Sequence, residues 1–283
     1  MILSYHPMIV ADRNRICAGQ DPDHEDRLHI SLAQAVILPQ GCRKSLYDMA
    51  IQNCANVFPN YDARFQYNGK IGQIELFREM DLNHPPTETF IDLADFYRHY
   101  PNLPERWMTD FPLVVKFDWG GEGETVHFVQ DRQGLKTVLE TARKYELSGQ
   151  RGFLIQPYIP HRKRVLRVVV MDRRFETYWR IQDDPQKPLA NIRQGGRIDA
   201  DGDPALQNKA VRAAAGFCQT AGINLAGLDM IFEAGKEEDG PCFLEINYFF
   251  GRRGLGGSES YYSMLNQAVG AWLKRRNLSG VHL

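Results

Sequence analysis

Three side chains near the C-terminal end of the sequence have the types and spacing of a magnesium site. Asp229 lies in the apolar run 227–232, and Glu245 and Asn247 lie in a second apolar run, 243–247. Two carboxylates and an amide are hard oxygen ligands, which Mg²⁺ prefers, completing its shell with water and phosphate. A solvated strand face explains an isolated Glu-x-Asn equally well, so the interpretation depends on what else the chain offers to a metal-bound nucleotide.

The segment between the two runs predicts how these side chains meet. Residues 234–241 are acidic and rich in turn formers, which is typical of a hairpin. Because strand side chains alternate between the two faces of a sheet, Glu245 and Asn247 are expected on one face, beside the aspartate of the partner strand. The same alternation predicts that Leu244 and Ile246 point the other way, into a core.

A lysine followed by a glycine-rich turn could hold phosphate. Lys116 ends the apolar run LVVK, and the turn after it contains Gly120, Gly121 and Gly123. Glycines let backbone N–H groups approach an anion, and the lysine adds a point charge. Neither the Walker A pattern nor the Rossmann fingerprint occurs, and a tight hairpin turn explains the glycines about as well as a ligand does. Lys70 is an ordinary surface lysine unless the fold pairs it with Lys116.

The composition argues against several classes of function. The chain has 283 residues, of which 43% are hydrophobic, and a net charge of -1. This length suits one large domain or a few small ones, and the balanced charge argues against a nucleic-acid binder. The five cysteines are scattered without a C-x-x-C pair, which predicts reduced thiols and a cytoplasmic location. We expect no signal peptide and no membrane span.

Hydrophobic periodicity predicts an α/β unit followed by antiparallel α+β structure. In residues 1–66 we expect strands at 2–5, 35–38 and 56–58 and a helix at 43–54. Beyond them we expect helices within 68–80 and at 92–99, 133–147, 204–221 and 261–276. The expected strands are 112–117, 125–129, 153–156, 165–171, 174–181, 227–232 and 243–247, several of them linked as hairpins.

The order of these pieces resembles the ATP-grasp superfamily, and within it the RimK-type carboxylate–amine ligases. The resemblance covers about residues 68–283, roughly three quarters of the chain. It rests on six segments in the family's order, namely NGKIGQIELF, LVVKFDWGGEGETV, FLIQPYI, RVVVMDRRFETYWRI, NIRQGG, and an Asp followed by Glu-x-Asn. Each match alone is common, and the ordered set is specific.

The resemblance implies an α+β ATP-grasp fold in which two subdomains clamp ATP. It divides the chain into a short pre-ATP-grasp α/β domain at 1–66, a lid or central subdomain at 67–155, and a C-terminal subdomain with the metal site at 156–283. The implied catalytic residues are Arg167, Arg180 and Asn191. The implied ATP-binding residues are Lys70, Lys116, Gly120, Gly121, Gly123, Gln156, Pro157, Tyr158 and Ile159. Asp229, Glu245 and Asn247 would bind two Mg²⁺ ions, with Mn²⁺ as an alternative.

The sequence departs from the family pattern at two places. The adenine hinge carries Pro157 where the family has Glu, which removes one N–H donor but keeps a carbonyl, so neighbouring residues must make the adenine contacts. Val165 stands where the family has an acidic residue two positions before Arg167, which implies different ribose or acceptor contacts. The domain at 1–66 is also shorter than usual.

Plain structural roles stay open for several basic residues. Arg167 and Arg180 are also consistent with ion-paired strand side chains. The basic stretch 161–164 is expected to be a solvated loop, with steering of ATP or of an acidic substrate as the alternative. Arg252 and Arg253 follow the metal strand in a glycine-rich loop, where they are either surface residues or a fork for a substrate carboxylate or an acyl phosphate.

The implied reaction is the ATP-dependent joining of a carboxylate to an amine, an amino acid or a peptide, through an acyl phosphate. The expected partners are small molecules rather than nucleic acid or membrane, and a homo-oligomer is compatible with the sequence. Two alternatives stay open: an ATP-grasp kinase acting on a small hydroxyl compound, and a non-catalytic nucleotide-binding module. The sequence does not identify the substrates.

Overall fold

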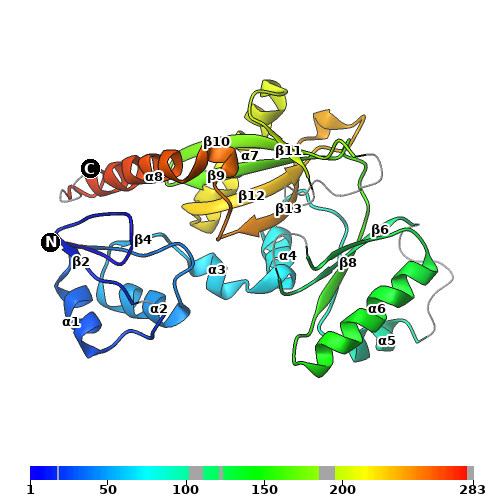
Figure 1. Ribbon diagram of the computed structural model, residues 1–283, viewed down its shortest axis with the longest axis horizontal. Helices are drawn as coiled ribbons and strands as arrows, with labels where there is room; N and C mark the ends of the chain where they lie inside the picture. Colours follow the sequence, from blue (N-terminus) through cyan, green and yellow to red (C-terminus); the bar gives the residue numbers. More distant parts are fainter. Residues whose placement is uncertain (18, 102–110, 121–123, 185–194, 279–283) are drawn as a thin grey trace.

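The computed structural model describes residues 1–17, 19–101, 111–120, 124–184 and 195–278. Its strands form three sheets with the orders β2-β1-β3-β4, β5-β8-β6-β7 and β11-β10-β9-β12-β13 (Figure 1). Helices pack on each of the three sheets, which confirms the predicted mixture of α and β structure. No helix in these described ranges is long and apolar enough to cross a lipid bilayer.

The N-terminal unit is a small parallel sheet flanked by short helices. Its strands are β1 (Ile2–Ser4), β2 (Arg13–Asn14), β3 (Ala35–Ile37) and β4 (Val57–Phe58), and its helices are α1 (His24–Leu32), α2 (Lys44–Asn53) and α3 (Asp62–Gln66). Every strand pair is parallel, which agrees with the predicted α/β unit. Helix α1 was not predicted, because few of its residues are apolar; a capping box between Asp23 and Asp26 starts it.

The central unit is antiparallel and has a core of its own. Its elements are β5 (Glu88–Phe90), α5 (Leu93–His99), β6 (Leu113–Phe117), β7 (Val126–Val129), α6 (Arg132–Leu147) and β8 (Phe153–Pro157). Phe96, Phe117 and Phe153 are almost fully buried in that core. The helix before these elements, α4 (Gly69–Glu79), packs on the C-terminal sheet through β13 as well as on β8.

The C-terminal unit is a five-stranded antiparallel sheet between two long helices. Its elements are β9 (Arg164–Met171), β10 (Arg174–Ile181), β11 (Arg197–Asp199), α7 (Pro204–Ala221), β12 (Leu225–Ile231), β13 (Cys242–Asn247) and α8 (Gly257–Lys274). Both predicted hairpins are confirmed. The prediction that the last helix begins at residue 261 was wrong, because it starts after Gly256, whose φ of 79° forms the cap.

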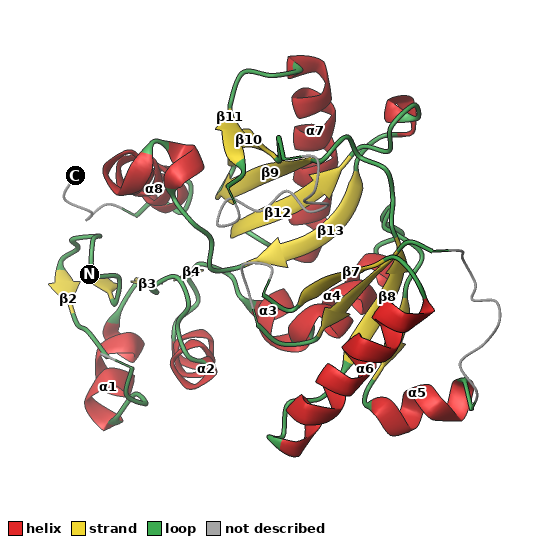
Figure 2. Ribbon diagram, turned by 45° about the vertical axis from the view of Figure 1, so that its right-hand side comes forward, coloured by secondary structure: helices red, strands yellow, loops and turns green. Residues whose placement is uncertain are grey.

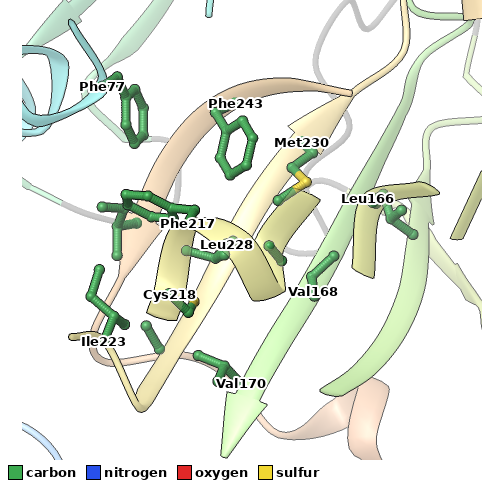
Figure 3. Close-up of a cluster of buried hydrophobic side chains, with 14 of the residues drawn as sticks. Phe77, Leu166, Val168, Val170, Phe217, Cys218, Ile223, Leu228, Met230 and Phe243 are labelled. Atoms are coloured by element: carbon green, nitrogen blue, oxygen red, sulfur yellow. The ribbon is translucent and has the colours of Figure 1, made fainter. Parts of the chain in front are cut away.

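Alternation along β9 places its side chains in two different cores. Val168 and Val170 pack with α7 in the cluster that Figure 3 shows. Val169 and Met171 point to the other face, into a cluster shared with α8 and with the strands of the N-terminal unit. The segment beginning at Ile2 and the helix α8 therefore lie side by side in both ribbon views (Figures 1 and 2), although they stand at opposite ends of the sequence.

A β-bulge in the β12–β13 hairpin changes the predicted direction of one side chain. The register shifts between Asp229 and Met230 on β12, which leaves Leu244 as an extra residue on β13. Leu244 therefore lines the cavity on the same side as Glu245, whereas Ile246 returns to the core as expected. The prediction that Leu244 points into the core was wrong, because strict alternation fails at a bulge.

Candidate active site

A cavity of about 500 Å³ lies between the central sheet and the C-terminal sheet. Figure 2 shows the two sheets facing each other, with β8 and β7 beside the β12–β13 hairpin. The cavity size is in the range of small-molecule sites, about 300–1,000 Å³. Apolar residues gather in one part of the lining, and the rest carries charged side chains, among them Asp229 in contact with Arg167 and Arg180. Such a division suits a ligand with a flat apolar group and a polyanionic tail.

Two buried lysines in this cavity lie within the electrostatic influence of one carboxylate, that of Glu245. The side chains of Lys70, in the first turn of α4, and Lys116, on β6, belong to residues that are 7% and 9% exposed. Burial lowers the pKa of both ammonium groups; Glu245 opposes this effect at both, and Lys70 reinforces it at Lys116. Lys70 Nζ also donates to the carbonyls of Trp119 and Gly120, at 3.2 and 3.1 Å. The structure thus pairs the two lysines, as the resemblance implied.

Asp118 joins the elements that carry these lysines, a role that the sequence reasoning missed. Its Oδ1 accepts a hydrogen bond of 2.7 Å from the N–H of Ile71, one of the free donors at the start of α4. Gly69 has a φ of 71°, and a Cβ there would lie 2.4 Å from Asp118 Oδ1. The only sign of this role in the sequence was that Asp118 follows Lys116 by two residues. Its partner Ile71 lies 47 residues away in sequence, so the contact could not be predicted.

The predicted hinge residues lie on the apolar part of the cavity. Gln156, Pro157, Tyr158 and Ile159 all line it. Gln156 belongs to the β6–β8 ladder, and its side-chain amide donates to Thr87 Oγ1 at 2.8 Å. The apolar cluster beside the hinge consists of Ile159, Val165, Ile231, Cys242 and Leu244. Leu244, the extra residue at the β-bulge, therefore contributes to the apolar surface that a nucleobase would contact.

Hydrogen bonds within the hinge leave one backbone donor for a base. The Tyr158 N–H donates to the Pro112 carbonyl at 3.0 Å, and Pro157 has no N–H. The Ile159 carbonyl is 2.7 Å from His161 Nδ1. Within the described chain the Ile159 N–H makes no hydrogen bond, so it is the donor that remains for the base edge. The sequence had left Gln156, Tyr158 and Ile159 open for this contact.

Asp229 forms ion pairs with both arginines of the β9–β10 hairpin. Its Oδ1 is 2.5 Å from Arg167 Nε and 2.6 Å from Arg180 Nη2, and its Oδ2 is 2.9 Å from Arg167 Nη2. The Asn247 amide donates to Oδ2 at 3.2 Å. Burial by itself raises the pKa of Asp229, but Arg167 and Arg180 more than offset it and hold that pKa below its usual value. The carboxylate is thus ionised, as a metal ligand must be, and its contacts in this structure are with the two arginines and the Asn247 amide.

Glu245 is the carboxylate of the site that remains free. It lies directly opposite Asp229 across the β12–β13 ladder, and it makes no ion pair or hydrogen bond with any other described side chain. Its carboxylate oxygens are half-buried and make no bond to those side chains. Together with the amide oxygen of the neighbouring Asn247, they are ligands of the type that bind a divalent cation. The described residues contain no group of three or more His, Cys, Asp and Glu side chains arranged for a metal. The three predicted ligands, two carboxylates and one amide, do lie together.

Three predicted site residues, Gly121, Gly123 and Asn191, lie outside the described residues. Gly120 has a φ of 78°, and a Cβ there would be 2.6 Å from Thr125 Cγ2, so the turn after β6 requires glycine at this position.

The basic stretch at 161–164 differs from the solvated loop that was predicted. His161 is buried and lines the cavity. Burial lowers the pKa of His161, an effect that its hydrogen bond to the Ile159 carbonyl opposes. The Arg164 guanidinium stacks on the Trp179 ring at 4.1 Å. Only Arg162 is exposed, at 64% of its side chain, and it forms an ion pair of 2.8 Å with Glu237.

These features define a clamp in which two antiparallel units face each other across paired lysines and an acidic hairpin. The family of RimK-like ATP-grasp domains matches residues 84–263, more than half of the chain. The chain belongs to this family, which confirms the predicted resemblance. A search of curated proteins gave no match.

Solved structures show the same fold across nearly the whole chain. A RimK domain protein of the ATP-grasp type from Sphaerobacter thermophilus has a TM-score of 0.59 at 15% identity, over 94% of this chain and 98% of its own. D-alanine–D-alanine ligase from Bacillus anthracis complexed with ATP has a TM-score of 0.62 at 16% identity, over 90% and 84%. D-cycloserine synthetase has a TM-score of 0.58 at 16% identity, over 95% and 97%. These similarities confirm the α+β ATP-grasp fold.

Proposed function

We propose that this protein is an ATP-dependent ligase that joins a small-molecule carboxylate to an amine through an acyl phosphate. One observation carries the proposal: a single cavity combines two buried lysines, the acidic β12–β13 hairpin and two arginines of the β9–β10 hairpin. The family assignment supports it, and ligases are among the proteins that share the fold.

ATP is bound along the cavity from the hinge to the lysines. The Ile159 N–H and the apolar cluster around Leu244 hold the adenine, while Lys70 and Lys116 bind the phosphates as point charges. Burial strengthens these charge interactions because little water screens them. Gly120, Gly121 and Gly123 are proposed to add backbone N–H donors to the phosphates.

Asp229, Glu245 and Asn247 would hold Mg²⁺, as two ions, with Mn²⁺ as an alternative metal. When bound, the metal neutralises phosphate charge and fixes the orientation of the phosphate chain. Arg167 and Arg180 are already in contact with Asp229. They therefore lie within reach of the group that reacts, and they stabilise negative charge that develops there. Asn191 stays a proposed catalytic residue.

The proposed reaction has two steps. A carboxylate oxygen of the first substrate attacks the γ-phosphorus, a P–O bond forms, and the bond to the bridging oxygen breaks to release ADP. The amine nitrogen then attacks the acyl carbon, loses a proton and expels inorganic phosphate, which leaves an amide. Because an acyl phosphate hydrolyses readily, the cavity must exclude water while both steps occur.

An ADP-release assay with a chemical trap tests this function. The protein is incubated with Mg²⁺ and ATP and with pooled amino acids and small carboxylates, and hydroxylamine captures the acyl phosphate as a hydroxamate. We expect ADP and hydroxamate together, and loss of both in Glu245→Gln. A phosphorylated hydroxyl compound in place of hydroxamate would establish the kinase alternative, and nucleotide binding without any ADP release would establish a non-catalytic module.

We further propose that the enzyme works in the cytoplasm on small molecules rather than on nucleic acid or membranes. All five cysteines are free, which suits a reducing compartment. The proposed domain division stays 1–66, 67–155 and 156–283. Each of these ranges holds one of the three sheets almost entirely, and α4 connects the second range to the third.

A further inference from the structure

The outer edge of the β12–β13 hairpin is bonded to a side chain from another element. β13 is the last strand of the C-terminal sheet in the described chain, so one of its sides faces no further strand. On that side the side-chain amide of Gln73, in α4, bonds both backbone groups of Ile246. Gln73 Nε2 donates to the Ile246 carbonyl at 2.9 Å, and the Ile246 N–H donates to Gln73 Oε1 at 2.8 Å. At this one residue the amide takes the place of a neighbouring strand.

Ile246 stands between Glu245 and Asn247, the two proposed metal ligands of β13. Both of these residues pair directly with residues of β12. In an antiparallel ladder, the residue between two such hydrogen-bonded pairs turns its own N–H and carbonyl to the opposite side. The contact with Gln73 therefore holds the strand from outside and leaves the side chains of both ligands free.

The helix that carries Gln73 also carries one of the paired lysines. Lys70 lies three residues before Gln73 on α4, so the two side chains share a face of the helix. Burial lowers the pKa of Lys70 and Glu245 opposes this effect, so the two charged groups interact across the cavity. Both ribbon views show α4 beside β13 (Figures 1 and 2). Gln73 thus joins the helix of Lys70 to the strand of Glu245 within one helical turn of the lysine.

α4 is bonded to the central unit as well. The N–H of Ile71 donates to Asp118 Oδ1, two residues beyond Lys116. The helix therefore has a polar contact with each of the two units that face the cavity. Lys70 lies next to the first contact in sequence and one turn before the second, so a shift at either contact would move the lysine.

Protection of an exposed strand edge is the alternative role of Gln73. An uncovered edge can pair with another chain, and proteins cover such edges with helices, loops or charged side chains. A second residue covers the same edge: Asn83 Nδ2 donates to the Pro241 carbonyl at 3.3 Å, and the Phe243 N–H donates to the Asn83 carbonyl at 2.8 Å. Asn83 is not part of the cavity lining, so a comparison of the two side chains separates edge protection from a role in the site.

We propose that Gln73 is a positioning residue that couples the binding of nucleotide to the binding of metal. It holds the helix of Lys70 in place relative to Glu245 and Asn247, so that one phosphate chain can reach both the lysine and the acidic hairpin. The inference rests on the proposed function and adds a residue to its site. Without Gln73 the lysines still attract phosphate, but the hairpin is free to shift, and the metal then adds less to nucleotide affinity.

Calorimetry on the full chain measures this coupling without turnover. Binding of a non-hydrolysable ATP analogue is measured with Mg²⁺ and again with a chelator in place of Mg²⁺, and the ratio of the two affinities is compared between variants. We expect the wild-type protein to bind the analogue more tightly with Mg²⁺. Gln73→Met keeps the length of the side chain but loses both hydrogen bonds, so it should reduce the ratio roughly tenfold. The affinity without metal should change by no more than about twofold.

Two further variants complete the comparison. Gln73→Asn keeps the amide but is one methylene shorter, so it should lower the ratio in the same direction, and it replaces Gln73→Met if that variant does not fold. Asn83→Ala removes a side-chain bond to the same edge and should keep the wild-type ratio. Urea unfolding of each variant is measured beside the binding, because edge protection alone predicts a loss of stability with an unchanged ratio.

The outcomes separate this inference from the proposed function. An unchanged ratio in the Gln73 variants, or an equal loss in Asn83→Ala, overturns the inference while the proposed function stands. Equal binding of the analogue to the wild-type protein with and without Mg²⁺ also overturns it, because no coupling then exists for Gln73 to support. Failure of the wild-type protein to bind the analogue under either condition would instead overturn the proposed function.

Discussion

At the residue scale, Asp229 and Glu245 are neighbours on one hairpin with opposite surroundings. Asp229 is buried and bound by two arginines, whereas Glu245 is uncommitted within the described chain. Asp229→Asn would leave the buried guanidinium of Arg167 without its counter-charge, so we expect the free energy of unfolding to fall by about 3–5 kcal/mol. Glu245→Gln should lower it by less, because Glu245 makes no ion pair or hydrogen bond with a described side chain and acts on Lys70 and Lys116 only through its charge. Urea unfolding of both variants without nucleotide measures the contrast.

Equal effects of the two substitutions would contradict this assignment. A destabilisation of similar size in both would mean that Glu245 also supports the fold. A negligible effect in both would mean that the contacts of Asp229 with Arg167 and Arg180 do not persist in solution. Wild-type protein under the same conditions gives the reference.

His6 predicts a pH dependence of stability. Its pKa is lowered from 6.5 to about 4 by burial and by Arg252, so between these values the unfolded chain binds a proton that the folded protein does not. Stability should therefore fall as the pH drops through this window, by about 2 kcal/mol at pH ~5. Urea unfolding at pH ~8 and ~5 tests this.

The variant His6→Asn serves as the comparison, because its amide oxygen can accept the hydrogen bond of 3.1 Å that Met8 N–H donates to His6 Nδ1. The variant should lose less stability on acidification than the wild type does. An identical loss in both proteins would show that other groups cause the acid sensitivity.

The sequence could predict which residues gather in the site, but not how each is engaged. The alternation of side chains along one strand was sufficient to predict that Glu245 and Asn247 lie on the same face, because they are two residues apart on β13. The ion pairs of Asp229 depend on arginines from a different hairpin. Asp118 was missed because a capping contact between distant segments leaves no local pattern.

At the element scale, the short 3-10 helix Arg253–Leu255 depends on one glycine. A Cβ at Gly254 would lie 2.3 Å from the Tyr178 ring, whereas Gly251 in the same loop has nothing within 4 Å of its Cβ position. Gly254→Ala should therefore lower the free energy of unfolding by about 1–3 kcal/mol through overpacking. Gly251→Ala, the matched control, should stay within about 0.5 kcal/mol of the wild type.

Thermal or urea unfolding of the two alanine variants measures this difference. Tyr178 is buried and pairs with Arg167, so a shift of its ring in Gly254→Ala should also displace that arginine. If both variants unfold like the wild type, the loop does not rest on the ring as the structure shows.

Most long elements could be predicted from periodicity, and the short or glycine-rich ones could not. Helix α6 has a clear apolar pattern and begins after the N-cap residue Asp131. The β9–β10 hairpin also has a clear apolar pattern, and Asp172 and Arg173 form its turn. Strands β5 and β11 have three residues each, too few to show a period. The first turn of α8 contains glycine and serine, which hide its start. The bulge at Leu244 depends on pairing with β12, which no single strand reveals.

At the scale of the whole molecule, the N-terminal unit and the C-terminal sheet share one core, while the central unit has another. Phe58 of β4 packs on Trp272 of α8, with ring centres 5.6 Å apart, and both are almost fully buried. Trp272→Ala should therefore lower the free energy of unfolding by about 3–5 kcal/mol. Its effect should reach probes in the N-terminal unit as well as in the C-terminal one.

Hydrogen exchange of the variant, followed segment by segment, measures how far the effect extends. We expect faster exchange in β1, β3 and α8 together. The central core around Phe96 and Phe153 should be much less affected, because it has no residue in common with the shared core. Faster exchange confined to α8 would contradict a single shared core. The sequence could not predict which units share a core. The apolar faces of β1, β9 and α8 can be recognised in it, but they do not specify which elements pack against them.

The shared core also has a consequence for how the chain is made. Ile2 and Ile37 belong to the same core as Leu265 and Val269, which a ribosome adds more than roughly 200 residues later. At roughly 5–20 residues per second, the first strands wait many seconds with their apolar side uncovered. This core can therefore form only after both segments have left the ribosome.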